Sequence, residues 1–269
     1  MRGSLWRTLV ALPTLLRVGF AETLVYRAEF LVWILAYTMP VIMLALWSAV
    51  AREGRLGRFG EQEFQAYFLA TLVVRLLTGA WVVWAMNTDV RQGTLQLRLL
   101  RPVHPLVTYL AENLAALPLR VALLIPIALA GVWVFDLDPF HLSTLQVMVV
   151  PLSLVGAFLL TFLPMACIGT LSLFWESSIA LYDLWLGLYT VLSGYVMPLE
   201  FFPDQVRSVI DWLPFRQTLA FPVESMLGLS SKQQMLRDLS LQWAWIGLFF
   251  VLLTRLWRAG TKRFSAYGG

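Results

Sequence analysis

The side chains best suited to acid–base catalysis in this chain are four carboxylates between residues 193 and 228. Paired carboxylates can divide the roles of general acid and general base. None of the four has a histidine nearby in the sequence, and the hydrolase motifs G-x-S-x-G and H-E-x-x-H occur nowhere in the chain. We therefore expect no catalytic site. The four residues are Glu200, Asp204, Asp211 and Glu224.

Residues suited to bind metals or nucleotides are also scarce. The chain holds one cysteine, Cys167, and two histidines, His104 and His141, whereas a structural zinc site takes about four Cys or His ligands. The phosphate-binding loop G-x-x-x-x-G-K-[ST] is absent from the sequence, so we do not expect this chain to hydrolyse ATP by that machinery. The sequence predicts no disulfide framework, no metal and no cofactor in this chain.

The composition indicates a membrane protein. Hydrophobic residues make up 59% of the 269 residues and charged residues 13%, which is about half the charged share of a soluble protein. The formal net charge is +4. An excess of Lys and Arg in cytoplasmic loops explains this charge, so we expect no nucleic-acid partner. The predicted fold class is an all-α integral membrane protein.

Six stretches are long and apolar enough to cross a bilayer as helices, each of which takes about 20 residues. The alternating segments typical of membrane β-barrels are missing from the sequence. Pro151 and Pro164 interrupt the long fourth stretch and predict a tilted or kinked helix, while the last stretch is short. The predicted spans are 30–50, 66–86, 114–135, 146–174, 179–197 and 241–257.

The distribution of Lys and Arg predicts the orientation. With the N-terminus inside, four of these residues precede the first span, three lie between the second and third spans, and four lie at or beyond the inner end of the last span. The cytoplasmic segments then hold 11 and the outer segments seven. Because cytoplasmic loops are enriched in Lys and Arg, we expect both termini in the cytoplasm, although three arginines occupy the first outer loop.

The N-terminal segment 1–28 has a basic start and an apolar middle, so a signal peptide must be considered. Arg17 and Pro13 interrupt the apolar run, and no clear small-x-small cleavage site follows. On a helix, Leu9, Leu16 and Phe20 would share one face. This pattern predicts an amphipathic helix that lies in the cytoplasmic interface.

Three charged residues fall within the predicted spans, where an ionised side chain must face protein, water or headgroups. Arg120 lies near the inner end of its span, so we expect it to snorkel to the interface in a structural role. Arg75 is ten residues into its span, and a buried partner or a water-filled cavity is as plausible for it as anchoring. Asp183 could reach the inner interface or pair with a cation.

The cytoplasmic loop 87–113 contains a short amphipathic element. A glycine precedes it, leucines alternate with polar residues along it, and prolines end it. An ordinary basic anchoring loop is the simpler interpretation, and docking to a partner is the functional one. The residues concerned are Gly93, Leu95, Leu99, Leu100, Arg101 and Pro102.

The outer segment 198–228 is cut every few residues by prolines, at Pro198, Pro203, Pro214 and Pro222. Each piece between them is too short to cross a bilayer and too apolar to lie free in water. We expect short helices that lie in or dip into the outer leaflet, because irregular backbone at membrane depth must be covered by protein.

In order and spacing, these features resemble the permease subunits of bacterial type-2 ABC exporters. The run Gly93-Thr-Leu-Gln-Leu-Arg-Leu-Leu-Arg-Pro102 resembles the loop after their second span. The residues Ser193-Gly194, Pro198, Phe202-Pro203 and Leu213-Pro214-Phe215 resemble their proline-broken segment before the final span. The ending with Trp257, Gly260, Arg263-Phe264 and Tyr267-Gly268-Gly269 is similar to the tail of one branch of uncharacterised permeases in that group. The resemblance covers nearly the whole chain.

The resemblance implies half of a transporter in a bacterial inner membrane. Two permeases, identical or paralogous, would form the pathway, and two separate ATP-binding cassette subunits would hold ATP and Mg²⁺ and power it. By the family pattern, the run 93–102 would be a coupling helix, the segment 1–28 an elbow helix, and the segment 198–228 the re-entrant helices that close the exit. The candidate pathway or gate residues are Arg75, Asp183, Pro198, Phe202 and Pro203.

Two other classes stay open at this point. An ion-coupled carrier or channel would use Arg75 and Asp183 as its intramembrane charges, and a membrane scaffold would transport nothing. The absence of an obvious inverted repeat counts weakly against a secondary transporter. The sequence also leaves the substrate open among drugs, lipids, lipopeptides and polysaccharides.

Overall fold

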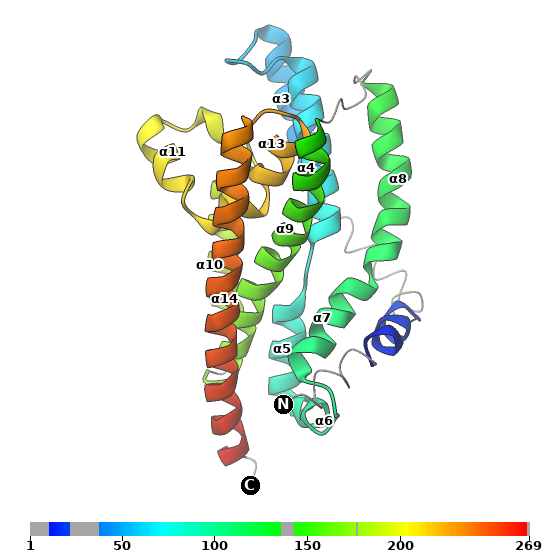
Figure 1. The fold of residues 1–269 in the computed structure, drawn as a ribbon, viewed down its shortest axis with the longest axis vertical. Helices are drawn as coiled ribbons and strands as arrows, with labels where there is room; N and C mark the ends of the chain where they lie inside the picture. Colours follow the sequence, from blue (N-terminus) through cyan, green and yellow to red (C-terminus); the bar gives the residue numbers. More distant parts are fainter. Residues whose placement is uncertain (1–10, 22–37, 136–142, 176, 268–269) are drawn as a thin grey trace.

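Long helices running up and down make up most of the chain (Figure 1). The computed structural model describes residues 11–21, 38–135, 143–175 and 177–267. Within these ranges the regular structure is helical, apart from an isolated β-bridge between Leu56 and Phe59. The all-α prediction is therefore confirmed for the described residues.

The helix Ala11–Ala21 comes first in the described chain. Two 3₁₀ helices, η1 and η2, follow α9 and α10. The elements in chain order are α3 (Met39–Glu53), α4 (Glu61–Thr78), α5 (Val82–Arg91), α6 (Leu95–Leu99), α7 (Pro105–Ala115), α8 (Leu117–Val134), α9 (Thr144–Thr170), η1 (Leu171–Leu173), α10 (Ile179–Leu192), η2 (Leu199–Phe201), α11 (Asp204–Ile210), α12 (Pro214–Thr218), α13 (Ala220–Met226) and α14 (Lys232–Tyr267).

Four helical segments of the described chain are long and apolar enough to cross a membrane: Glu61–Arg91, Pro105–Val134, Thr144–Leu173 and Lys232–Phe264. They correspond to the second, third, fourth and sixth predicted spans. The two remaining positions hold shorter helices, α3 with 15 residues and α10 with 14. Part of the first predicted span, and most of the segment 1–28, lie outside the described residues. Six crossings therefore stay a prediction.

The last span is longer than the short stretch 241–257 suggested. α14 has 36 residues and runs from Lys232 to Tyr267. Its ends are polar but rich in Lys, Gln, Arg and Leu, which favour a helix, so the backbone continues beyond the apolar part. α9 likewise stays helical through Pro151 and Pro164, and it runs obliquely to α14 (Figure 1).

The fifth predicted span, 179–197, extends beyond the end of the helix that the structure shows there. α10 stops at Leu192 rather than at residue 197. Gly194 has a φ of +87°, a left-handed conformation that glycine adopts readily. A Cβ there would lie 2.5 Å from the hydroxyl of Tyr67, which donates to the Gly194 carbonyl at 2.9 Å. The chain therefore turns inside the bundle and enters the proline-broken segment.

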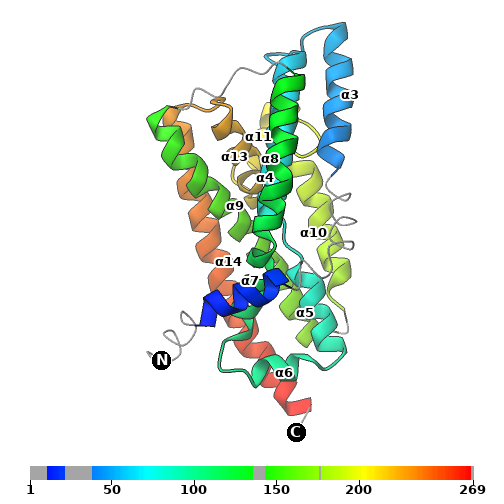
Figure 2. The ribbon, with the colours of Figure 1, turned by 90° about the vertical axis from the view of Figure 1, so that its right-hand side faces the viewer.

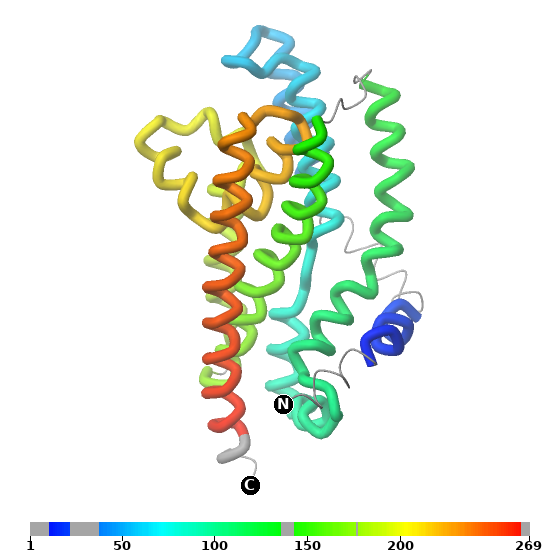
Figure 3. Tube along the Cα trace, viewed as in Figure 1, coloured from blue at the N-terminus to red at the C-terminus, as the bar shows by residue number. Residues whose placement is uncertain are grey.

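The molecule has two structurally different ends, which we call the α6 end and the α11 end. The helix Ala11–Ala21, the last turns of α14 and α6 itself lie toward one end (Figure 2). The short helices α11–α13 form an excursion between α10 and α14 at the other end (Figure 3). α9 lies at the centre, packed along α14 and touching α4, α5, α12 and α13.

Candidate functional site

The α6 end is a helical hairpin whose tip is α6. Gly93, with a φ of +75°, turns the chain after α5 at little conformational cost. Pro105 begins α7, where its missing N–H is not needed, and Nδ1 of His104 accepts a hydrogen bond from the Leu106 N–H at 3.2 Å. The imidazole lies 5.7 Å from the ring of Trp257, and burial lowers the pKa of His104. The tip is thus held against α14.

Apolar side chains cover the outer face of α6. Leu97, Leu99 and Leu100 are 61%, 39% and 83% exposed, and Arg101 and Pro102 beside them are exposed as well. Leu95 differs, because its side chain is 1% exposed within the core cluster that contains Tyr109. We expected Leu95 to face the membrane or a partner. That expectation is wrong, because Leu95 packs inward and ties α6 to its own chain.

Arg98 fixes the orientation of α6. Its Nε donates to Oδ2 of Asp89 at 2.6 Å, and its Nη1 donates to Glu112 and, at 3.2 Å, to Thr108. The guanidinium carbon lies 4.2 Å from the ring centroid of Tyr109, whose hydroxyl also donates to Asp89 at 2.6 Å. One side chain of α6 therefore bonds to the last turns of α5 and to α7.

The Arg98 network is partly withdrawn from water. The side chains of Arg98, Asp89 and Glu112 are 18%, 15% and 31% exposed, so their attraction is screened less than that of a surface pair. Burial lowers the pKa of Arg98, but Glu112, Tyr109 and Asp89 outweigh it and the pKa is raised overall. We infer that α5, α6 and α7 behave as one rigid unit.

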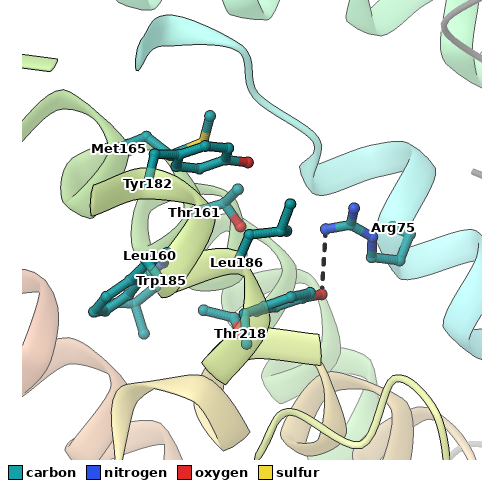
Figure 4. A pocket seen from close by; sticks show the side chains of 9 residues that line it. Arg75, Leu160, Thr161, Met165, Tyr182, Trp185, Leu186 and Thr218 are labelled. Atoms are coloured by element: carbon teal, nitrogen blue, oxygen red, sulfur yellow. Dashed lines mark hydrogen bonds between the residues drawn. The ribbon is translucent and has the colours of Figure 1, made fainter. Parts of the chain in front are cut away.

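Arg75 lies against a small, partly open cavity (Figure 4). Its Nη1 donates to the hydroxyl of Tyr189 at 3.2 Å, and its guanidinium lies 5.1 Å from the ring centroids of both Tyr189 and Tyr195. The cavity has a volume of about 30 Å³. This is room for water but not for a drug-sized molecule. The lining residues are Arg75, Leu160, Thr161, Met165, Tyr182, Trp185, Leu186, Tyr189 and Thr218.

Asp183 is exposed on α10 and does not line this cavity. Among the residues that the structure describes, no ion pair joins it to Arg75. The two intramembrane charges of the carrier hypothesis are thus not brought together. In the same described ranges, no group of three or more His, Cys, Asp and Glu side chains could hold a metal ion.

At the α11 end, α12 and α13 are buried and pack against α9 and other helices of the bundle. Of the three candidate gate residues, Pro198 is buried, Phe202 is half-buried and Pro203 is exposed. Short helices in the segment 198–228 agree with the sequence interpretation. Within that segment α12 and α13 are buried inside the bundle, whereas most residues of α11 are exposed.

Arg216 of α12 holds this end together. Its guanidinium contacts Asp211 at 3.1 Å, Glu224 at 2.7 Å and Asp238 at 2.6 Å. The side chains of Arg216 and Asp238 are 2% and 3% exposed. One buried cation thus joins the chain between α11 and α12, α13 and α14. The sequence interpretation had counted Arg216 only as a loop charge.

A comparison with known families now decides the class. The sequence profile described as ABC-2 family transporter protein matches residues 34–268. This chain belongs to the ABC-2 transporter family. No curated protein matches it. Members of this family are multi-pass membrane components of ABC transporters without a catalytic site of their own, and they work with ATP-binding cassette partners.

One expectation about the ABC-2 chain needs correction. Arg120 does not snorkel to an interface, since its side chain is 3% exposed in the protein interior. Its Nη1 donates to the carbonyl of Gly79 at 2.6 Å and to that of Leu76 at 3.4 Å. These carbonyls belong to the end of α4, so the role of Arg120 is structural, as expected, but it bonds to protein backbone instead of headgroups.

Sequence reasoning missed Arg98, Arg216 and Asn113 as positioning residues of the ABC-2 chain. A usable signal existed for the first, because Asp89, Arg98 and Glu112 are charges within a short loop and its flanking turns. Asn113 offered a weaker signal, as an amide inside an apolar run. No local pattern marks Arg216 for its partner Asp238, which lies beyond the intervening helix α13.

Proposed function

We propose that this chain is the membrane-spanning half of an ATP-driven exporter, and that α6 receives the work of a separate ATPase. The observation that carries the proposal is the outward apolar face of α6. Leu97, Leu99 and Leu100 are exposed at the tip of a hairpin that Arg98 and Leu95 hold in place. A chain without a phosphate loop needs such a contact to obtain energy from ATP.

The proposed mechanism is alternating access. ATP binding would close two cassette subunits on each other and displace the α6 tips that dock in them. Energy would enter through contacts of α6 that differ between the two states. The exit at the α11 end, closed by α12 and α13, would open in response. ATP and Mg²⁺ would belong to the partner, and α6 would lie on the cytoplasmic side of a bacterial inner membrane.

A second permease, identical or paralogous, completes the proposed pathway. Only 17% of the most apolar window of Lys232–Phe264 and 28% of that of Pro105–Val134 are buried within this chain. These helices therefore offer apolar surface both to lipid and to another subunit. The cavity beside Arg75 is too small for a substrate, which supports a pathway formed between two chains rather than inside one.

Serine substitution of the α6 face tests the proposal. Removing apolar contact area costs about 25 cal/mol per Å², so Leu99→Ser with Leu100→Ser should remove a few kcal/mol of contact. We expect the double variant to insert and fold but to lose co-purification of the ATPase. Leu99→Met with Leu100→Met is the matched control and should retain it. Full retention of a functional ATPase by the serine variant would show that α6 is only an anchor.

An ion-coupled carrier or channel remains the second candidate, because Arg75 lies within a span and contacts the hydroxyl of Tyr189. Such a protein would act without an ATPase. Reconstitution of the purified chain alone separates the two candidates, since ion-driven uptake in the absence of any ATP-binding subunit would favour the carrier.

A further inference from the structure

The two spans that flank α6 are both interrupted, and at matching positions. Gly79 lies twelve residues before Arg91, the end of α5, and Ala116 lies eleven residues after Pro105, the start of α7. The extended stretch between α4 and α5 and the bend between α7 and α8 are visible in Figure 1. Both interruptions fall inside apolar segments long enough to cross a membrane.

Each interruption has a local cause. Gly79 has an extended backbone, with φ −60° and ψ 142°, so α4 cannot continue into α5. In the other span, Pro118 lies in the first turn of α8. Its nitrogen carries no hydrogen to bond the carbonyl four residues earlier, and its ring clashes with that carbonyl. The helix therefore breaks at Ala116, which is both the C-cap of α7 and the N-cap of α8.

Side chains from α7 and α8 satisfy the backbone that the first break exposes. Arg120 donates to the carbonyls of Leu76 and Gly79 and lies 5.1 Å from the ring of Trp81. Oδ1 of Asn113 accepts the Trp81 N–H at 2.9 Å, while its Nδ2 donates to the Tyr109 carbonyl at 2.8 Å. In an apolar medium, an unpaired backbone group is costly, so these two side chains make the break tolerable.

The two side chains lie on opposite sides of the second break. Asn113 belongs to α7, before Ala116, and Arg120 belongs to α8, after it. Asn113 therefore links the start of α5 to α7, whereas Arg120 links the end of α4 to α8. Below the breaks, the Arg98 network makes α5, α6 and α7 one unit. Above them, α4 and α8 pack on each other.

We propose that α5, α6 and α7 move as one lever about the paired breaks, and that Arg120 and Asn113 are the positioning residues that transmit this movement to α4 and α8. The inference rests on the proposed function, because it assumes that α6 is where movement begins. Conformational hinges are a few residues at element ends that absorb changes in φ and ψ. The long side chain of Arg120 can keep bonding to carbonyls while the angle between α4 and α5 changes.

A cysteine reporter at the opposite end of the molecule tests the lever. In a Cys167→Ala background, Ser225→Cys places a thiol in α13, where Ser225 is 0% exposed. The complex with its ATPase is treated with an impermeant maleimide, without nucleotide and with ATP and vanadate. We expect a nucleotide-dependent change in labelling in the parent, and at least a several-fold loss of that change in Arg120→Gln and Asn113→Ala, with ATPase co-purification unchanged.

Two further variants calibrate this result. Arg91→Gln removes the same charge from an exposed position on α5 and should behave as the parent. Arg120→Lys keeps the charge with fewer donors and should restore part of the change. If Arg120→Gln does not fold, Arg120→Lys is the variant in which the nucleotide-dependent labelling change is measured. A merely structural role would lower the yield of folded complex but leave the nucleotide-dependent change per complex intact.

Failure of the lever and failure of the proposed function give different results. If Arg120→Gln, Arg120→Lys and Asn113→Ala bind the ATPase and show the full labelling change, the lever is wrong and the exporter stands. If the parent itself binds no ATPase, the proposed function is wrong. Hydrogen exchange in the chain alone then tests the hinge, because Asn113→Ala removes the acceptor of the Trp81 N–H and should speed exchange at that amide, and unchanged exchange there would overturn it.

Discussion

The two ends of this permease are each organised by one arginine among carboxylates, yet they present opposite surfaces. At the α6 end, Arg98 is partly buried between Asp89 and Glu112, and leucines beside it point outward. At the α11 end, Arg216 is almost fully buried among three carboxylates, and α12 and α13 around it are buried too. The same chemistry leaves an exposed apolar surface at one end and a buried cluster of short helices at the other.

The two surfaces suit the different roles that we propose for the two ends. A partly exposed network orients α6 and leaves its apolar face available, as a surface that meets a partner requires. Burial of an ion network carries a large desolvation cost. At the α11 end, the contacts of one guanidinium with α13 and α14 offset this cost and link both helices to α12. Opening that end would have to move or break these contacts, whereas docking at α6 leaves its network intact.

The proposed orientation predicts that cysteines at one end react with an impermeant reagent and that a cysteine at the other end does not. In a Cys167→Ala background, single cysteines at the exposed positions Ser143 and Gln205 should react with an impermeant reagent in intact cells, because we place the α11 end outside. A cysteine at the exposed position Gln92 should not react. Labelling of Gln92→Cys from outside, at a rate comparable with Gln205→Cys, would reverse the proposed orientation.

Substitution of Arg216 should have the largest effect on stability. Arg216→Gln leaves Glu224 and Asp238 buried without their cation, and breaking a buried pair in this way costs about 3–5 kcal/mol. We expect a strong loss of monodisperse protein and a large fall in melting temperature in detergent. Arg237→Gln is the control, because Arg237 is exposed and lies next to Asp238 on α14. A near-normal melting temperature for Arg216→Gln would mean that this end is not held by its ion network.

Substitution of Arg98 should act more locally. Arg98→Gln loses hydrogen bonds to charged groups, each of which contributes about 1.5–3 kcal/mol, but the core beneath α6 remains, with Leu95 inside it. We expect modest thermal destabilisation and a several-fold weaker capture of the ATPase by a chain that still inserts. Arg101→Gln removes the neighbouring exposed charge and serves as the control. Equal capture by both variants would refute a special role for Arg98.

Patterns in the sequence were enough to predict most of the helices, but not the side-chain contacts between them. Apolar runs predicted the long helices because lipid and core both demand continuous apolar stretches. Gly93 and the prolines predicted a short α6 because these residues end helices by local sterics alone. The end of α10 was misplaced because Gly194 turns the chain while apolar residues continue past it.

The arginine partners could not be predicted from local sequence. Arg216 meets Asp238 across α13, and Arg120 meets Gly79 across the three helices α5, α6 and α7. Such contacts depend on packing between elements far apart in sequence. The three arginines of the predicted first outer loop count against the predicted orientation, and two of them bond to carboxylates only eight or nine residues away. Each forms an ion pair with a glutamate: Arg52 with Glu61, Arg55 with Glu63 and Arg58 with Glu200.

Site-specific photo-crosslinking tests the central claim, that an ATPase docks on α6, most directly. Leu100 and Trp133 are equally exposed, at 83% and 84%, but Leu100 lies at the α6 end and Trp133 near the far end of α8 (Figure 1). A photoreactive amino acid at position 100 should crosslink to an ATP-binding cassette subunit in native membranes, and the same residue at position 133 should not. No crosslink from position 100, or an equal crosslink from both positions, would contradict the account.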